Sequence, residues 1–358
     1  AIYNDAGGLV QGNSPFQIAW LPDENRDRQL QRVEREVEQH TPRYKARPIV
    51  FEGGVPADIS RNQQLEEMLA TWSPAKRPAT SHAYLGEAVA IKPPTCATFQ
   101  RHSGANFAMV GQRDEAALAM MSSALVSLAA QHAPNDAVFY VFDGTPPDAP
   151  NAGYLQDVTR RLPHVVHNIA YREVDQAMAD LGAVVEQRQD ANETDAKSIY
   201  VLIYGLQRFR NLRRQEDTFS FSMDDENKPP TPDKHFSNIL REGPVFGVHT
   251  LMWCDSLTNF ERSVDRHAMR EIEQRALFQM SSTDSSTLID SPAAGKLGLQ
   301  RALLFNEEEG RIETFRPYAL PEEPWLEHMA ARLGGGAASD NPTSPAAEAG
   351  RASESTSR

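Results

Sequence analysis

A glycine that ends an apolar run is the first place where this sequence could bind a phosphate. The run Asn106–Val110 leads into Gly111, and a long helical pattern follows at once. Strand, glycine and helix in this order are typical of a phosphate-binding loop of the form GxxxxGK(S/T), whose lysine and hydroxyl contact the phosphates and magnesium. In that register the second glycine, the lysine and the hydroxyl residue fall on Ala116, Ala117 and Leu118. The loop therefore has the right place in the chain and lacks the side chains of phosphoryl transfer.

The remaining residues of this loop weaken its case as an anion site. Gln112 and Arg113 come next, and Asp114 and Glu115 fall in the first turn of the expected helix. Free backbone amides at the start of a helix attract anions. Two carboxylates in the first turn, however, complement the helix dipole themselves and repel phosphate. We therefore expect residues 111–118 to be a degenerate nucleotide site.

Two more apolar runs end where ligands bind in parallel sheets, at the carboxyl ends of the strands. One run ends at Asp143, before Gly144-Thr145-Pro146, and the other ends at Tyr204-Gly205. The Asp143 carboxylate could approach a metal ion, but we favour a turn residue that caps the backbone after it. Phosphoryl transfer also needs an acid that holds magnesium and a group that positions water. Tyr204-Gly205 offers neither, so this strand end adds no catalytic group.

The densest basic cluster of the chain follows Gly205 within a few residues. Its side chains could contact DNA, a neighbouring subunit or a nucleotide held by an adjacent domain. An exposed helix face that pairs with Glu216 and Asp217 explains them at least as well. The cluster consists of Arg208, Arg210, Arg213 and Arg214.

For several other polar residues we expect structural roles or leave a functional role open. His249 lies within an apolar run, so we expect a core histidine rather than a ligand. Arg262 or Arg275 could reach a neighbouring site as a finger, although one sequence does not establish this. Ser281, Ser282 and Asp284 are expected to form hydrogen bonds within a turn. No metal-ligand spacing and no pair of nucleophile and base stands out, so we assign no catalytic residue and no metal site.

Length and composition limit the function classes. The chain has 358 residues, of which 40% are hydrophobic, enough for one large α/β domain or two small ones. Its formal charge of −13 disfavours a broad nucleic-acid-binding face. Cys96 and Cys254 both lie in apolar contexts, which favours buried free thiols in a reducing compartment. No apolar run approaches the roughly 18 residues of a membrane span, and no signal peptide is present, so we expect a cytoplasmic location without direct membrane contact.

The first part of the chain is expected to be organised separately from the rest. Residues 1–21 predict a hairpin with Phe16–Leu21 as its return strand, followed by a charged helix near Glu24–Gln39. A Pro-rich linker over 41–56 would carry one short strand, Pro48–Glu52. A helix near Asn62–Thr71 precedes the main domain. The sequence lacks an initiator Met and starts within a pattern, so we expect the C-terminal piece of a longer protein.

In the main domain, apolar runs alternate with helical patterns, which predicts a doubly wound, mostly parallel sheet flanked by helices. The expected strands are Ala88–Ile91, Thr95–Phe99, Phe107–Val110, Ala137–Asp143, Val165–Ile169, Ser198–Tyr204, Val245–Trp253, Leu277–Met280 and a closing hairpin of Arg301–Asn306 with Arg311–Tyr318. The expected helices are Glu115–Gln131, Tyr154–Arg161, Val174–Asp190, Leu206–Glu216, His235–Glu242, Phe260–Glu273, a short one within Ser281–Lys296, and Trp325–Leu333. Phe219–Lys234 is expected to be a flexible loop, with acidic residues at 223–226, and the tail from Gly334 to be disordered.

Three later blocks give this order of features a family likeness. They are Arg241–Met252 with its Gly-Val-His, Arg275–Asp290 with its paired serines, Asp-Ser and Leu-Ile-Asp, and Gly295–Phe305 with a Gly-rich turn and strand. Together with the loop at Gly111, in the Walker A position, and Tyr204-Gly205, in the Walker B position, they resemble the FtsK/SpoIIIE P-loop translocases over roughly residues 80–320. Residues 1–24 look like the end of another such domain. Tandem domains of this kind are similar to the motors of type VII secretion systems.

This resemblance implies a RecA/FtsK-like P-loop NTPase fold with a C-terminal β-hairpin. It also implies ATP and Mg²⁺ as cofactors of the parent protein but not of this domain, a preceding ATPase domain as partner, a homo-oligomer such as a hexameric ring, and DNA or a secreted protein as substrate. Any membrane association would come through the missing N-terminal part. The implied domains are 1–21 (terminal hairpin of a preceding domain), 22–80 (helical linker), 81–333 (degenerate domain) and 334–358 (tail).

Three functions remain open at this point. The first is a structural or regulatory domain of a larger ATP-driven translocase that has lost its own catalysis. The second is a nucleotide-binding part of an active DNA or protein translocase. The third is an interaction module without any link to nucleotide.

Overall fold

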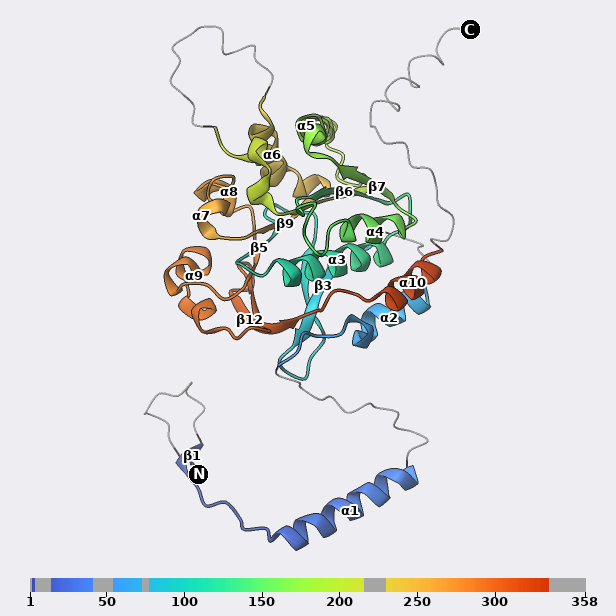
Figure 1. Ribbon diagram of the computed structural model, residues 1–358, viewed down its shortest axis with the longest axis vertical. Coiled ribbons are helices and arrows are strands. Elements are labelled where there is room, and N and C mark those ends of the chain that lie inside the picture. Colours follow the sequence, from blue (N-terminus) through green and yellow to red (C-terminus); the bar gives the residue numbers. More distant parts are fainter. Residues whose placement is uncertain (1, 4–13, 41–53, 73–76, 216–229, 335–358) are drawn as a thin grey trace. The chain divides into compact units, whose positions relative to one another are not determined.

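The computed structural model describes residues 2–3, 14–40, 54–72, 77–215 and 230–334 (Figure 1). The chain divides into two compact units, Ala1–Phe51 and Glu52–Arg358, and each is described by itself. The predicted strand Pro48–Glu52, the acidic loop at 223–226 and the tail from 335 onward lie outside the described residues. The domain boundaries expected from the sequence stay predictions.

The first unit contains a small antiparallel pair and one helix. Strand β1 (Ile2–Tyr3) pairs with β2 (Ser14–Pro15), so a hairpin is present, but the predicted return strand Phe16–Leu21 is wrong. Within the described part of this unit no second strand lies beside those residues, and Trp20 is 86% exposed. Helix α1 (Asp23–His40) confirms the predicted helix. Its apolar residues Leu30, Val33 and Val37 are all exposed.

The described part of the second unit is built on one ten-stranded sheet. Its strands lie in the order β4-β3-β12-β11-β10-β5-β9-β8-β6-β7. The run from β10 to β7 is parallel, and the pairings from β10 to β4 are antiparallel. The predicted α/β class with a mostly parallel sheet and a closing hairpin is confirmed. The strands are β3 (Ser81–Ala88), β4 (Thr95–Phe99), β5 (Phe107–Val110), β6 (Ala137–Asp143), β7 (Val165–Ile169), β8 (Ser198–Tyr204), β9 (Val248–Cys254), β10 (Gln274–Leu277), β11 (Ala302–Asn306) and β12 (Arg311–Pro317).

Helices cover both faces of this sheet (Figure 1). One core contains residues of α2, α3, α4 and α10, and the other contains residues of α5, α6, α7, α8 and α9. Neighbouring strand residues point into opposite cores, as Ala108 and Met109 do, which is the period of two of a strand buried on both faces. The helices are α2 (Gln63–Ala70), α3 (Asp114–Gln131), α4 (Tyr154–Arg160), α5 (Val174–Asp190), α6 (Pro232–Glu242), α7 (Leu257–Phe260), α8 (Arg266–Met269), α9 (Ser282–Ile289) and α10 (Glu323–Arg332).

Helix α3 is the central helix of its face, because it is buried on nearly all sides from Ala117 to Ala130. Its sequence explains this, since Ala, Leu and Met alternate with small serines rather than with charges. The hydroxyls of Ser122 and Ser123 donate to the carbonyls of Leu118 and Ala119, four residues earlier, at 2.8 Å. These bonds satisfy polar atoms in a helix that has no solvent-facing side.

Several predicted elements of the second unit differ from the observed ones. The strand Ala88–Ile91 is wrong, because β3 ends at Ala88 and bends follow it. The helix expected over 206–216 is two 3-10 turns, Leu206–Arg208 and Arg210–Leu212. The helix Phe260–Glu273 is instead α7 and α8.

The broken helix has a local cause. Asp265 accepts hydrogen bonds from the backbone N–H groups of His267 and Ala268, so it caps a new helix in the middle of the predicted one. Val264 and Ile272, both fully buried, fix the chain on either side of α8. Strand β10 also begins three residues earlier than predicted, at Gln274. Within the described residues, no helix has both the length and the apolar character that spanning a bilayer requires.

Candidate functional site

The loop after β5 needs its glycine for backbone reasons. Gly111 has φ +129°, a conformation that side chains disfavour, and a Cβ there would lie 2.9 Å from Cβ of Phe278. The Gly111 amide donates to the carbonyl of Cys254 at 3.0 Å. The glycine therefore has a structural role that does not depend on a phosphate.

This loop is also too short to wrap around phosphates. Helix α3 begins at Asp114, so only Gly111, Gln112 and Arg113 separate it from β5. The Arg113 amide donates back to the Gly111 carbonyl at 3.0 Å, which turns the chain directly into the helix. A GxxxxGK(S/T) loop would start its helix later, near its second glycine.

The positions expected to carry the lysine and the hydroxyl lie inside the core. Ala117 is fully buried and Leu118 is 1% exposed, one turn into α3. Both belong to the core between α3 and the sheet. Ala116 is half-buried, and Asp114 and Glu115 are exposed in the first turn, where the sequence expected them. A side chain at 117 therefore does not face open space at the edge of the sheet.

Two aromatic side chains, Tyr204 and Trp253, lie next to this loop at the carboxyl edge of the sheet. We call them the aromatic pair. They are register neighbours at the ends of β8 and β9, and their rings stack with centroids 4.7 Å apart. The indole N–H of Trp253 donates to the Gly111 carbonyl at 3.1 Å, and the Tyr204 hydroxyl donates to the Asp114 carbonyl at 3.0 Å. Burial, with a smaller contribution from Asp114, raises the pKa of Tyr204, so the phenol stays a protonated donor.

The aromatic pair thus fills the ends of β8 and β9, and Tyr204-Gly205 is where the sequence resemblance leads us to expect an acid. Both rings are almost fully buried, Tyr204 at 4% and Trp253 at 2% exposure. Gly205, at φ +82°, turns the chain away from β8. Trp253 was not among the expected site residues, because an apolar residue at the end of an apolar strand gives no signal beyond core packing.

Asp143 at the end of β6 is a turn residue, as the sequence favours. Its Oδ1 accepts hydrogen bonds from the Thr145 N–H at 2.9 Å and from the Thr145 hydroxyl at 2.5 Å. The next amide, of Gly144, donates to the Tyr204 carbonyl at 2.8 Å. The carboxylate therefore stabilises its own turn.

The four arginines after Gly205 do not form one free basic face. The Arg208 guanidinium donates to the Gly144 carbonyl at 2.5 Å, and that of Arg213 donates to the Gln207 carbonyl at 2.7 Å. Arg214 forms an ion pair with Asp265 at 3.6 Å. Arg210 is exposed. Three of the four thus have local partners on the 3-10 turns that replace the predicted helix.

The remaining candidates have structural roles. His249 is buried, its Nδ1 lies 2.9 Å from the Ala105 carbonyl, and burial lowers its pKa to about 4. The Ser281 hydroxyl caps α9 by accepting from the Asp284 N–H. Arg275 is buried and donates to backbone carbonyls and to Glu307, so it is no exposed finger. Both cysteines are free thiols as predicted, but only Cys254 is buried, because Cys96 is partly exposed.

The residues at this edge do not fit a magnesium nucleotide. The loop supplies no lysine and no hydroxyl, and the aromatic pair stands where the acid is needed. The nearby Asp255 already has hydrogen-bond partners, since its Oδ1 accepts from the Ser256 hydroxyl at 2.9 Å and from the Asn259 side-chain amide at 2.8 Å. The only described group of His, Cys, Asp and Glu side chains with metal-site geometry lies elsewhere, at His102, Glu273 and Glu308. These residues were missed because they are far apart in the sequence.

Comparisons with known proteins agree on the fold. No protein-family model matches the chain, and no curated protein sequence does. Among solved structures, ATPases 2 and 3 of EccC from Thermomonospora curvata, in complex with a signal sequence peptide, superpose with TM-score 0.53 and 14% identity, over 80% of this chain and 53% of that one. The cytoplasmic domain of the same type VII secretion ATPase gives TM-score 0.54 and 13% identity, over 81% and 35%.

A conjugation protein extends this likeness beyond secretion. The pCW3 conjugation coupling protein TcpA gives TM-score 0.50 and 11% identity, over 80% of this chain and 75% of that one. The chain spans about half the length of the first structure named above, and about a third of the second. At these identities the likeness concerns the fold, and the chain accordingly has the fold of FtsK/SpoIIIE-type P-loop ATPase domains.

Proposed function

We propose that this chain is part of a larger ATP-driven translocase and contains a P-loop-fold domain that does not hydrolyse ATP itself. The single observation that carries this proposal is the aromatic pair, which fills the strand ends below the Gly111 loop and bonds to that loop. Catalysis of phosphoryl transfer requires charged groups at that place. A site filled by stacked rings and lacking the lysine has no means to stabilise the charge on a transferring phosphoryl group.

The role that follows is structural or regulatory. A domain of this fold that holds no nucleotide can still stack against an active ATPase domain, complete a ring of homologous domains, or dock a substrate. The similarity to ATPases 2 and 3 of EccC supports a neighbouring ATPase domain as the first partner. A homo-oligomeric ring is part of the proposal, and so is a place at the cytoplasmic side, by analogy with the cytoplasmic domain of EccC.

For the substrate of the parent protein we favour a protein over DNA. The structure of EccC in complex with a signal sequence peptide supports this choice, together with the formal charge of −13 and the local partners of three of the four clustered arginines. A DNA-tracking surface would need exposed cations free to contact phosphates.

Isothermal titration of ATP and Mg²⁺ into the 358-residue chain tests the proposal. We expect no binding in the submillimolar range, because the loop is short and its helix start is acidic. Submillimolar binding would overturn the proposal and favour the alternative, a nucleotide-binding part of an active translocase. If ATP does not bind, co-purification of this chain with an FtsK/SpoIIIE-type ATPase domain separates a motor component from an interaction module unrelated to nucleotide.

A further inference from the structure

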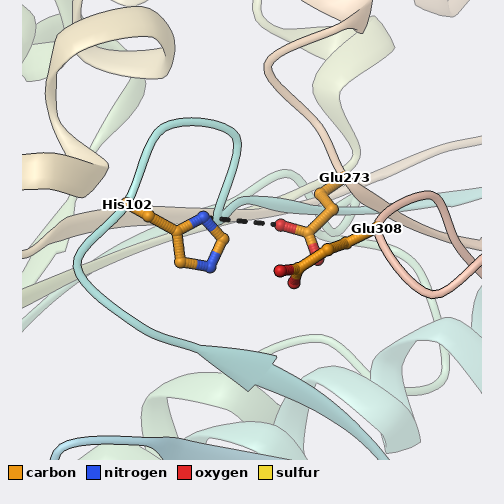
Figure 2. Close-up of side chains that lie close together, drawn as sticks. All are labelled: His102, Glu273 and Glu308. Carbon is orange, nitrogen blue, oxygen red and sulfur yellow. Dashed lines mark ion pairs between the residues drawn. The ribbon is translucent and has the colours of Figure 1, made fainter.

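A histidine and two glutamates meet at the amino edge of the sheet, away from the Gly111 loop. His102 lies in the loop after β4, Glu273 immediately precedes β10, and Glu308 lies in the turn between β11 and β12 (Figure 2). One potential ligand atom of each residue lies within 4.8 Å of those of the other two. We propose that His102, Glu273 and Glu308 bind a divalent transition-metal ion such as Zn²⁺.

The three loops are fixed by backbone hydrogen bonds rather than by the side chains themselves. The Glu273 amide donates to the Gly104 carbonyl at 2.9 Å, and the Glu307 amide donates to the Glu273 carbonyl at 2.9 Å. The buried Asn106 side chain donates to the Glu271 carbonyl at 2.7 Å. Ligands on loops held in this way need little ordering on binding, which favours affinity.

A backbone carbonyl contacts one nitrogen of the His102 ring. Its Nδ1 lies 2.8 Å from the Ser103 carbonyl, and a proton on Nδ1 donated there leaves the lone pair on Nε2. Figure 2 shows the ring edge that carries both nitrogens facing the two glutamates, with the ion pair drawn from Nδ1 to Glu273. A ring nitrogen bonded to a backbone carbonyl fixes the tautomer of metal-binding histidines.

The charges of this cluster are not balanced within it. The Glu273 side chain is only 12% exposed, and its Oε2 lies 3.6 Å from Nδ1 of His102. Glu308 adds a second carboxylate next to the same ring. Two carboxylates carry more negative charge than one imidazolium can balance, and a metal ion would contact all three side chains at once, although Glu308 is exposed to solvent. The other acids of this edge have partners of their own: Glu271 with Ser103, Glu307 with Arg275, and Glu309 with Arg311.

The donor set selects the class of ion. Imidazole nitrogen with carboxylate oxygen suits Zn²⁺ and similar transition metals, whereas Ca²⁺ and Mg²⁺ prefer oxygen ligands alone. Three protein ligands leave further positions to water. The ion would join the β11–β12 turn to the loops at β4 and β10, and thus the antiparallel part of the sheet to its parallel part. An ion that binds only the folded chain raises its thermal stability.

The experiment titrates the metal-free 358-residue protein with Zn²⁺. Isothermal titration calorimetry measures the binding, and the melting temperature of the protein is determined with and without Zn²⁺. We expect one Zn²⁺ per chain and a rise in melting temperature. Replacing a ligand should weaken binding at least about tenfold, since even the loss of a supporting residue can cost that much. The variants are His102→Ala and Glu308→Gln, both at half-buried or exposed positions, where folding is checked by circular dichroism.

Glu309→Gln is the matched control, because it removes the same charge from the same turn without touching the cluster. It should bind Zn²⁺ like the unmodified chain. An equal loss of Zn²⁺ affinity in Glu308→Gln and Glu309→Gln would mean that Zn²⁺ responds only to the negative charge of this turn, and this would overturn the proposal. Unchanged affinity of His102→Ala, an equal response to Ca²⁺, or the absence of a saturable site would overturn it as well.

Discussion

At the carboxyl edge of the sheet, Gly111 follows β5, Tyr204 is the last residue of β8, and Trp253 is the second-last residue of β9. The Tyr204 and Trp253 rings stack there and donate hydrogen bonds to backbone carbonyls. At the amino edge, His102 and Glu273 lie among loops that also bring in other charged residues. A P-loop fold places its ligand at the carboxyl edge. In this chain the potential ligands of an ion lie at the other edge.

This difference shows that the fold determines where a ligand site can lie, whereas the side chains at that place determine what can bind there. The fold fixes where β5 turns into α3, and Gly111 is needed for that turn whether or not a phosphate is present. The chemistry of a site depends on which side chains occupy the turn. Here the aromatic pair supplies packing where a nucleotide site needs charge.

The strongest test of the filled carboxyl edge is the double substitution Ala117→Lys and Leu118→Thr. It restores the lysine and the hydroxyl of the motif, while Ala116 still stands in place of the second glycine. Both changed positions are buried, so a lysine there carries a charge into the core. We expect a loss of about 4 kcal/mol or more in the free energy of unfolding, and phosphate release at background level. Urea unfolding and a phosphate-release assay measure the two effects.

Gln112→Lys is the control for this substitution. It adds the same charge to the same loop at an exposed position, and the free energy of unfolding should change by no more than about 0.5 kcal/mol. ATP turnover by the double variant would mean that Tyr204-Gly205 does not mark the second nucleotide motif. A stable double variant would mean that position 117 faces the edge after all.

The amino edge should respond to acid more than the carboxyl edge does. Burial lowers the pKa of His164 and of His249 to about 4, and both begin or precede a parallel strand. Unfolding returns them to about 6.5, so below that pH the unfolded chain binds protons that the folded chain does not. The contribution of these two histidines to the free energy of unfolding is therefore fully present above pH 6.5 and is lost as the pH falls toward 4. Each histidine should cost about 1.4 kcal/mol of stability at pH 5.5.

Urea midpoints at pH 7.5 and pH 5.5 measure this loss. His249→Asn should reduce it by the contribution of one histidine, and His164→Asn should do the same. A pH dependence that survives in both His164→Asn and His249→Asn would place the acid-sensitive group elsewhere, for example at His132, whose pKa is also lowered by burial.

Much of the fold can be predicted from the sequence, for physical reasons that particular elements show. Ala137–Asp143 and Ser198–Tyr204 are continuous apolar runs, and only strands buried on both faces need such runs. Helix α3 was predictable because its small and apolar residues exclude a solvent-facing side. The region after β9 was not, because Asp265 starts a new helix inside a charged periodic pattern, and local capping there outweighs periodicity.

The sites divide in the same way. The sequence itself shows Ala117 and Tyr204 at the two positions where the family resemblance predicts a lysine and an acid. The role of Trp253 cannot be seen in the sequence, because it depends on β8 and β9 being neighbours in the sheet. The cluster of His102, Glu273 and Glu308 depends on the strand order as well, which brings together three loops that are distant in the chain.

A milder substitution sharpens the role of the aromatic pair. Tyr204→Phe keeps the stacked ring and removes only the hydroxyl that donates to the Asp114 carbonyl. We expect a loss of about 1 kcal/mol in the free energy of unfolding, the usual contribution of one hydrogen bond. Tyr171→Phe, at a tyrosine that is 51% exposed, should have no measurable effect. Equal stability of the two variants would show that the Tyr204 hydroxyl does not hold the loop.

The smallest effect is expected from the arginine cluster beside the carboxyl edge. Replacing Arg208, Arg210, Arg213 and Arg214 together by Ala should leave DNA affinity unchanged, because three of the four already bond to Gly144, Gln207 or Asp265. Fluorescence anisotropy with a labelled duplex at two salt concentrations measures this. If these residues bind DNA phosphates, the substitution would instead weaken binding and reduce the salt slope by about 0.9 for each phosphate that the variant no longer neutralises. That outcome would give the carboxyl edge a charged function next to its filled loop, and DNA would then replace a secreted protein as the favoured substrate.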